Sequence, residues 1–171
     1  WEPKNYDGKF EGFMSLRTAL SKSKNLVSVR VIRKIGPSYA QDFIQRFGFE
    51  PEKHPPYLTM ALGAGSVTPL QMATAYSVFA NGGYRVDPFL ISQMVDSKGV
   101  VLFEAQPVRA SVDATRVLDA RTAFVMDSML QEVTKSGTAA SARGKLGRSD
   151  IAGKTGTTND SHDAWFAGYN P

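Results

Sequence analysis

The chain has 171 residues, of which 42% are hydrophobic and 21% are charged, an ordinary balance for a globular domain with its own core. It contains no cysteine, which excludes disulfides and a cysteine nucleophile, and no apolar run is long enough to cross a membrane, so we expect no membrane contact by this segment. Its two histidines, His54 and His162, lie far apart in turn-like sequence, so we expect no metal site and no Ser-His-Asp triad. We also expect no cofactor.

The formal net charge of +4 is concentrated near the amino-terminal end. Residues 1–34 carry eight lysines and arginines against three acidic residues, whereas the rest of the chain is nearly neutral. Such a field attracts anionic partners, but no basic and aromatic pattern typical of nucleic-acid binding is present. We therefore predict no nucleic-acid partner and interpret the basic residues as a solvated surface.

The first two helix signals lie in the amino-terminal half. The segment 16–23, "LRTALSKS", has a helical pattern. Ser38 and Gln41 have the spacing of a capping box, and they precede an apolar stripe that ends at Phe47. Gly48 then predicts the end of this second helix.

Two further helices are expected downstream. Thr68 and Gln71 form another capping box, with proline at the first helical position, and the helix should stop at the asparagine and glycines of 81–83. The last predicted helix runs from about Arg121 to Ser136 and is terminated by a glycine.

Two hairpins complete the pattern. The segments 84–96 and 100–105 flank a Ser-Lys-Gly turn, and the segments 151–158 and 163–169 flank "NDSH". Helices followed by antiparallel hairpins predict an α+β fold, with an antiparallel sheet flanked by helices.

The sequence "GKTGTT" allows two interpretations. A phosphate-binding loop requires a glycine separated by four residues from Gly153, at position 148, but that position is Arg148, and Gly147 lies one residue too early. Such a loop also leads directly into a helix, whereas a turn and a strand pattern follow here. A nucleotide site is therefore disfavoured.

The alternative is a strand that binds a peptide. In ideal geometry Lys154 and Gly156 share one face and Thr155 and Thr157 the other, although a bulge or twist could bring them to one cleft. Gly156 leaves room for a peptide to pair along the strand edge. A Lys-Thr-Gly sequence alone is a weak signal, since a solvated turn lysine also explains it.

A second motif strengthens this interpretation. Ser23 and Asn25 form a Ser-x-Asn sequence, which occurs together with Ser-x-x-Lys and Lys-Thr-Gly in β-lactamases and penicillin-binding proteins. Between Ser23 and Lys154 there is room for a helical subdomain.

Three long blocks extend the similarity over nearly the whole chain. Residues 5–31, 62–91 and 151–171 resemble the transpeptidase domain of class A penicillin-binding proteins, most closely the 1A type. The resemblance implies a β-lactamase/transpeptidase-like fold with a helical subdomain. It also implies an enzyme that cross-links peptidoglycan stem peptides by acyl transfer from D-Ala-D-Ala and that is acylated by β-lactams. The expected location is the periplasmic side of the bacterial inner membrane, with the anchor and a glycosyltransferase domain outside this chain.

The resemblance also implies roles for individual residues. Ser23 and Lys154 would relay a proton to the leaving D-Ala, and Asn25 would orient the acyl-donor amide. The residues expected to bind the substrate are Thr155, Gly156, Thr157 and Thr158. Of these, the two threonines at 155 and 157 would bind the terminal carboxylate, and the Thr157 N–H would be an oxyanion donor.

One motif departs from the family pattern. The family's nucleophile lies on a separate Ser-x-x-Lys upstream, but here that pattern occurs only at Ser21–Lys24, overlapping Ser-x-Asn. We therefore expect the nucleophile before Trp1, so that 1–171 is a transpeptidase domain lacking its N-terminal part, and the N-terminal remainder of the same protein is its partner.

Other functions share some of these features. A β-lactamase needs a deacylating carboxylate, yet Glu50, Glu52 and Glu104 lie in no motif for it. A penicillin-sensing receptor, a carboxypeptidase and a non-catalytic peptidoglycan-binding module remain as alternatives.

Overall fold

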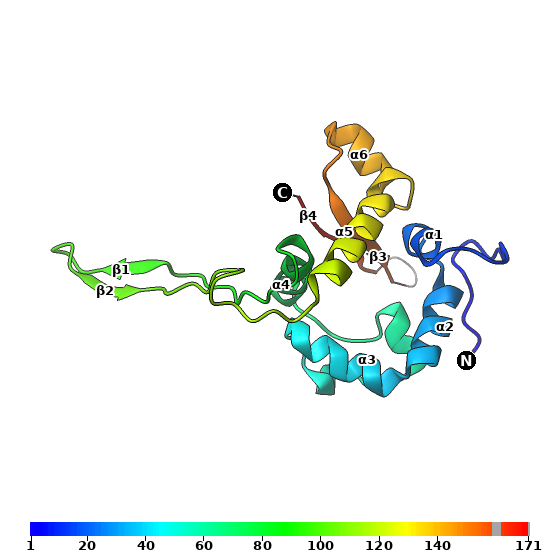
Figure 1. The fold of residues 1–171 in the computed structure, drawn as a ribbon, viewed down its shortest axis with the longest axis horizontal. Helices are drawn as coiled ribbons and strands as arrows, with labels where there is room; N and C mark the ends of the chain where they lie inside the picture. Colours follow the sequence, from blue (N-terminus) through cyan, green and yellow to red (C-terminus); the bar gives the residue numbers. More distant parts are fainter. Residues whose placement is uncertain (159–161, 171) are drawn as a thin grey trace.

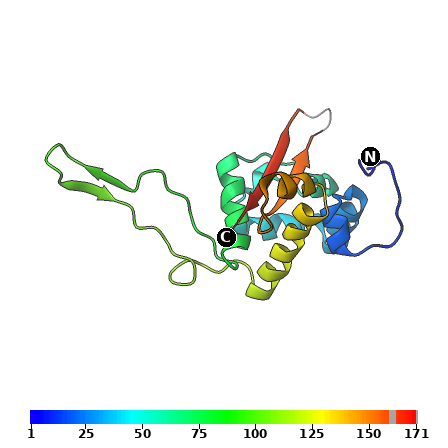
Figure 2. The same cartoon turned by 90° about the horizontal axis from the view of Figure 1, so that it is seen from above.

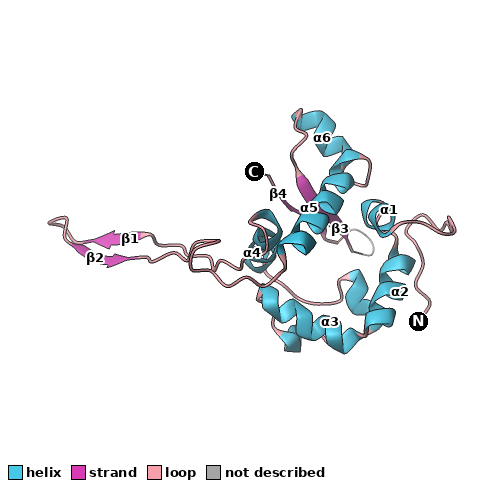
Figure 3. Ribbon diagram, in the orientation of Figure 1, coloured by secondary structure: helices cyan, strands magenta, loops and turns pink. Residues whose placement is uncertain are grey.

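The computed structural model describes residues 1–158 and 162–170, and it has an α+β architecture in which helices pack beside one two-stranded antiparallel sheet, while a second two-stranded sheet lies apart from them (Figures 1 and 3). The helices are α1 (Leu16–Ser21), α2 (Asn25–Ile35), α3 (Pro37–Ile44), α4 (Pro69–Ala80), α5 (Ala120–Lys135) and α6 (Ala140–Leu146). Short 3₁₀ turns are η1 (Gln45–Phe47), η2 (Pro51–Lys53) and η3 (Leu58–Leu62). The strands are β1 (Gln93–Val95), β2 (Val101–Glu104), β3 (Ala152–Thr157) and β4 (Ala164–Tyr169).

The core lies where α4, α5 and the end of the α3–η1 segment meet. Phe47, Ala75, Val78, Leu118 and Ala123 form one buried cluster. Helix α5 also contacts β3 and α1, so it is the central support that connects the amino-terminal helices to the sheet (Figure 1).

One predicted capping box is confirmed and the other is wrong. Thr68 caps α4, and its side chain and that of Gln71 each bond the other's backbone N–H. Helix α3 instead begins one residue earlier than the predicted box, at Pro37, and Ser38 is not its cap. Proline with its fixed φ suits the first helical position, and the Gln41 amide donates to the carbonyls of two residues of the following turns, at 2.9 and 3.0 Å.

Helix α2 has no start signal in the sequence. Lys24 at its N-cap position makes no side-chain cap, and the segment is rich in β-branched residues, which favour strands. Helix α5 lies within one residue of its predicted bounds. The part of the chain that the structure describes contains no helix long and apolar enough to span a bilayer.

Both predicted hairpins are present but differ in their surroundings. Strands β1 and β2 are shorter than expected and project from the body of the molecule (Figure 2). Strands β3 and β4 lie within one residue of the predicted bounds and pair in a continuous register from Ala152↔Tyr169 to Thr157↔Ala164. Most of the predicted "NDSH" turn, residues 159–161, falls outside the described residues.

Candidate active site

Ser23 lies at a sharp corner between α1 and α2. Its φ is 54°, in the left-handed region, which costs roughly 1–2 kcal/mol for a residue other than glycine. Two backbone hydrogen bonds hold the corner, from the Ser23 N–H to the Leu20 carbonyl at 3.0 Å and from the Lys24 N–H to the Ala19 carbonyl at 2.9 Å. The helix therefore ends in a fixed turn that presents the Ser23 side chain.

Lys154 meets this turn from β3. Its Nζ donates to Ser23 Oγ at 2.7 Å, across 131 residues of sequence, and to the Thr155 carbonyl at 3.0 Å. The side chain is half-buried, and burial lowers the pKa of the ammonium group because it disfavours the charged form. The two motifs thus converge on one site. Because Lys154 is followed by the rest of β3, up to Thr157, and not by the first turn of a helix, the phosphate-loop interpretation is wrong.

The end of α5 joins these two elements. A Cβ on Gly137 would lie 2.3 Å from the Ser21 carbonyl oxygen, so the absence of a side chain allows the close approach. The next residue, Thr138, donates its N–H to the same carbonyl at 3.0 Å. Its hydroxyl lies 2.6 Å from that of Thr155. Thr138 is a contact that sequence reasoning missed, and no local signal marks it.

The threonines of β3 are arranged differently from Lys154. No register shift occurs between β3 and β4, so Thr155 stays on the opposite face and its hydroxyl is bonded to Thr138. The Thr158 N–H donates to the Asp163 carbonyl at 3.0 Å, and its hydroxyl accepts from the Asp163 N–H at 2.8 Å. Thr158 therefore closes the hairpin, while Thr157 is exposed.

Successive backbone N–H groups of β3 point to opposite edges of the strand. Because the Thr158 N–H points to β4, the N–H groups of Thr157 and Thr155 point away from β4, toward the other edge of β3. Gly156 is exposed, and a Cβ placed there would meet only the Trp165 side chain, at 3.9 Å. The face of β3 that carries Lys154 consequently has room for a small side chain at Gly156.

Asn25 is the first residue of α2. Its Nδ2 donates to the Lys4 carbonyl at 2.9 Å, a contact with the amino-terminal segment. A carboxamide has two N–H donors, so this bond uses one of them. The structure brings Ser23 and Lys154 into direct contact, whereas Asn25 is connected to them through the turn.

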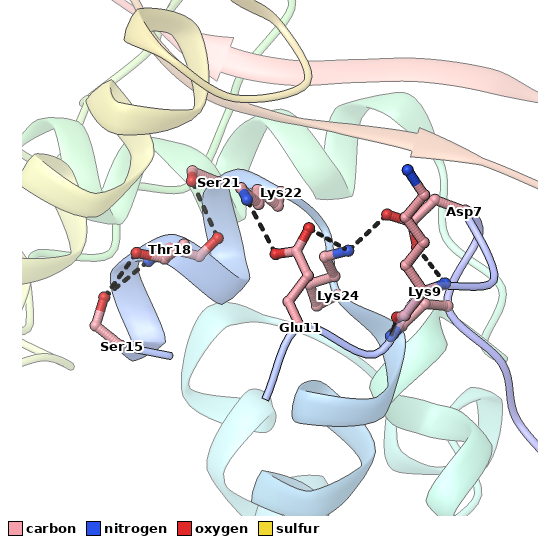
Figure 4. Close-up of polar contacts among 9 residues, drawn as sticks. Asp7, Lys9, Glu11, Ser15, Thr18, Ser21, Lys22 and Lys24 are labelled. Carbon is pink, nitrogen blue, oxygen red and sulfur yellow. Dashed lines mark hydrogen bonds and ion pairs between the residues drawn. The ribbon is translucent and has the colours of Figure 1, made fainter. Parts of the chain in front are cut away.

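Lys24 is the residue that sequence reasoning misjudged. Its side chain is only 4% exposed, and its Nζ lies 2.6 Å from Asp7 Oδ2 and 3.4 Å from Glu11 Oε1 (Figure 4). The hydrogen bond to Asp7 raises the pKa of Lys24 and lowers the pKa of Asp7. The interpretation of the basic segment as a solvated surface is therefore wrong at this position.

Among the residues that the structure describes, no three histidine, aspartate or glutamate side chains gather as a metal site would require. The chemistry available from these residues is that of a hydroxyl, an ammonium group and backbone donors.

A serine hydroxyl that meets a lysine at the edge of an antiparallel strand, beside a helical body, is typical of serine acyl-transfer enzymes of the β-lactamase and penicillin-binding type. Residues 1–171 match the penicillin binding protein transpeptidase domain, and the chain belongs to this family. The family resemblance seen in the sequence is thereby confirmed.

Relatives and solved structures agree with this assignment. The chain is 53% identical over 171 residues to penicillin-binding protein 1A of Neisseria lactamica, covering all of this chain and 21% of that protein. The crystal structure of penicillin-binding protein 1A from Haemophilus influenzae superimposes with a TM-score of 0.91 at 35% identity, over 99% of this chain and 30% of that one. A D,D-transpeptidase domain from Eggerthella lenta, at 22% identity and a TM-score of 0.77, covers 98% of this chain and 48% of that one and shares the fold. The chain spans about a fifth of the length of the curated relatives it matches.

Proposed function

We propose that the protein containing this chain is a serine D,D-transpeptidase that cross-links the stem peptides of peptidoglycan and is acylated by β-lactams. The observation that carries the proposal is the 2.7 Å hydrogen bond from Lys154 Nζ to Ser23 Oγ, since it joins two motifs that are 131 residues apart. Family membership supports the same activity. The protein would lie on the periplasmic side of the inner membrane, anchored by a segment outside this chain.

Acyl transfer requires a proton at the leaving amine. A serine outside 1–171 passes its proton to the lysine of its own Ser-x-x-Lys motif and attacks the carbonyl of the penultimate D-Ala. The bond to the terminal D-Ala then breaks, and the Ser23 hydroxyl donates a proton to the departing D-Ala nitrogen. Lys154, hydrogen-bonded to Ser23, restores that proton and also places positive charge at the site. The lowered pKa of Lys154 suits this role, because a buried ammonium gives up its proton more readily than an exposed one.

The substrate would lie along the edge of β3 that faces away from β4. The Thr157 N–H is directed to that edge and would donate to the oxyanion, an interaction worth roughly 3 kcal/mol. Thr155 and Thr157 would bind the terminal carboxylate, with Gly156 and Thr158 lining the same strand. Thr155 would first have to exchange its bond with Thr138. The second N–H of Asn25 would orient the donor amide.

The activity is tested with the full-length protein and two peptides, a donor ending in D-Ala-D-Ala and an amine-bearing acceptor. We expect cross-linked dimers and released D-Ala, and Ser23→Ala should slow their formation by roughly 10²-fold or more. Release of D-Ala without dimers would instead indicate a carboxypeptidase. Fast turnover of a penicillin, rather than a stable acyl-enzyme, would indicate a β-lactamase.

The position of the nucleophile is tested separately. After labelling with a penicillin, digestion and mass spectrometry should find the modified serine outside 1–171. Modification of Ser21 or Ser23 would overturn this part of the proposal and make the chain self-sufficient for acylation.

A further inference from the structure

Lys24 stands between the two proposed site residues, Ser23 and Asn25, yet its side chain is buried. At 4% exposure its ammonium group has lost most of its water, which is unfavourable unless opposite charges replace it. Asp7 supplies a carboxylate at 2.6 Å and Glu11 a second at 3.4 Å (Figure 4). Because a buried ammonium group is stable only next to opposite charges, these two contacts fix the direction of the Lys24 side chain.

The carboxylates belong to residues 4–11, a segment outside the helices and strands with a turn closed by the Gly8 N–H to the Asn5 carbonyl at 2.9 Å, which we call the amino-terminal strap. The strap also contacts the start of α2, where the Asn5 side chain accepts from the Leu26 N–H at 3.1 Å and the Lys4 carbonyl accepts from Asn25. Helix starts leave N–H groups without internal partners, and α2 has no side-chain cap from its own N-cap residue. The Asn5 side chain, 21 residues away from Leu26 in the sequence, therefore accepts a helix N–H that a local capping residue would otherwise bind.

These contacts surround a strained residue. Ser23 has a left-handed φ of 54°, and such a conformation persists only where the surrounding structure fixes it. The residue before the corner, Lys22, is the C-cap of α1, and the residue after it is Lys24. A turn held on both sides keeps Ser23 Oγ at hydrogen-bonding distance from Lys154.

We propose that Lys24 is a positioning residue for the reaction, and that its ion pair with Asp7 and Glu11 holds the Ser23 hydroxyl in place against Lys154. The inference rests on the proposed function of Ser23 and Lys154. Lys24 itself contacts neither substrate nor reacting atoms. Its ammonium group is turned to the strap, so its effect on the reaction passes through the geometry of Ser23.

The experiment compares two lysines that share a partner. In the full-length protein, Lys24→Met removes the buried charge and keeps an unbranched side chain, whereas Lys22→Met removes the exposed Lys22–Glu11 pair. The second-order rate of acylation by a fluorescent penicillin is measured for each. Lys24→Met should lower it roughly 10- to 100-fold, because displacement of a catalytic group by about 1 Å has effects of this size. Lys22→Met should leave it within about twofold.

The same substitution in a Ser23→Ala protein distinguishes positioning of Ser23 from a general effect on the stability of the fold. If Lys24 acts through the Ser23 hydroxyl, Lys24→Met should change the residual rate of a Ser23→Ala protein by less than about twofold. An equal drop in both backgrounds would show that Lys24 acts elsewhere and would overturn the inference. The melting temperature of each variant is recorded alongside.

Asp7→Asn is the second variant, for use if Lys24→Met does not fold. It keeps the lysine and alters one partly exposed partner, so it should lower the rate in the same direction, again only when Ser23 is present. A normal rate in Asp7→Asn or in folded Lys24→Met would refute the positioning role. Failure of the unmodified protein to bind penicillin at all would instead refute the proposed function.

Discussion

The two hairpins of this molecule have similar sequence signals, but they differ in how far they are buried against the rest of the protein. In β1–β2 every residue of both strands is exposed, and the hairpin projects from the body (Figure 2). In β3–β4 the first residues of β3 are buried against α5, and Ala152 is 1% exposed. A strand-like segment on each side of a turn forms a hairpin in either case. A side chain has a defined position only where other parts of the protein pack on its strand. Helix α5 packs on β3, and Ser23 accepts a hydrogen bond from Lys154.

The largest difference between the hairpins should appear in their lysines. Lys154→Ala in the full-length protein should slow acylation by a fluorescent penicillin by roughly 10²- to 10⁴-fold, since it removes a group for proton transfer. Lys98→Ala, in the exposed turn of β1–β2, is the matched control and should change nothing. Equal rates of labelling in both variants would show that Lys154 takes no part in acylation.

The next largest effect should be on stability, at Gly153 in β3. A Cβ there would lie 2.7 Å from the Ala167 carbonyl oxygen and 2.9 Å from the Gly168 Cα, so the strands must separate. Gly153→Ala should destabilise this domain by roughly 1–3 kcal/mol, seen as a lower melting transition in calorimetry.

Gly156→Ala is the control in the same strand. Its new methyl group would make only an ordinary van der Waals contact with Trp165, and alanine restricts the unfolded chain, so stability should be equal or higher by about 0.5 kcal/mol. A comparable loss of stability in both variants would argue against the tight pairing of β3 with β4 as the cause.

Local signals explain which parts of this fold could be predicted. The Thr68 cap, the end at Gly48 and both hairpins depend on residues a few positions apart, and all are found. Helix α2 could not be predicted because its first turn is satisfied by Asn5, and Pro37 rather than Ser38 begins α3. Such long-range partners leave no periodic trace in the sequence.

The same distinction applies to the site. The family's motifs identified Ser23 and Lys154, and their contact is present. The burial of Lys24 could not be seen, because a basic run resembles a solvated surface until Asp7 and Glu11 are placed beside it. Thr138 lies in an ordinary helix-ending sequence, and only the packing of α5 brings it to Thr155.

A smaller effect on activity is expected at Gly156. Gly156→Val should leave the melting transition unchanged, because nothing but the Trp165 side chain lies within 4 Å of the new Cβ. The branched side chain would nevertheless project from the face of β3 that carries Lys154 and narrow the space next to the strand edge along which we propose that substrate lies. Acylation should fall about tenfold. An unchanged rate would place the substrate away from this strand edge.

The smallest effect is expected at the contact that ties β3 to the end of α5. Thr138→Val removes the hydroxyl bonded to Thr155 and keeps the shape of the side chain. Both residues are at least partly accessible to water, so the loss should be about 1 kcal/mol, and the melting transition should fall by a few degrees. Thr155→Val should have the same effect, and the double variant should be less than additive, because either change breaks the same bond. Full additivity would mean that the two hydroxyls stabilise β3 through separate contacts, and that the packing which distinguishes this hairpin from β1–β2 does not depend on their mutual bond.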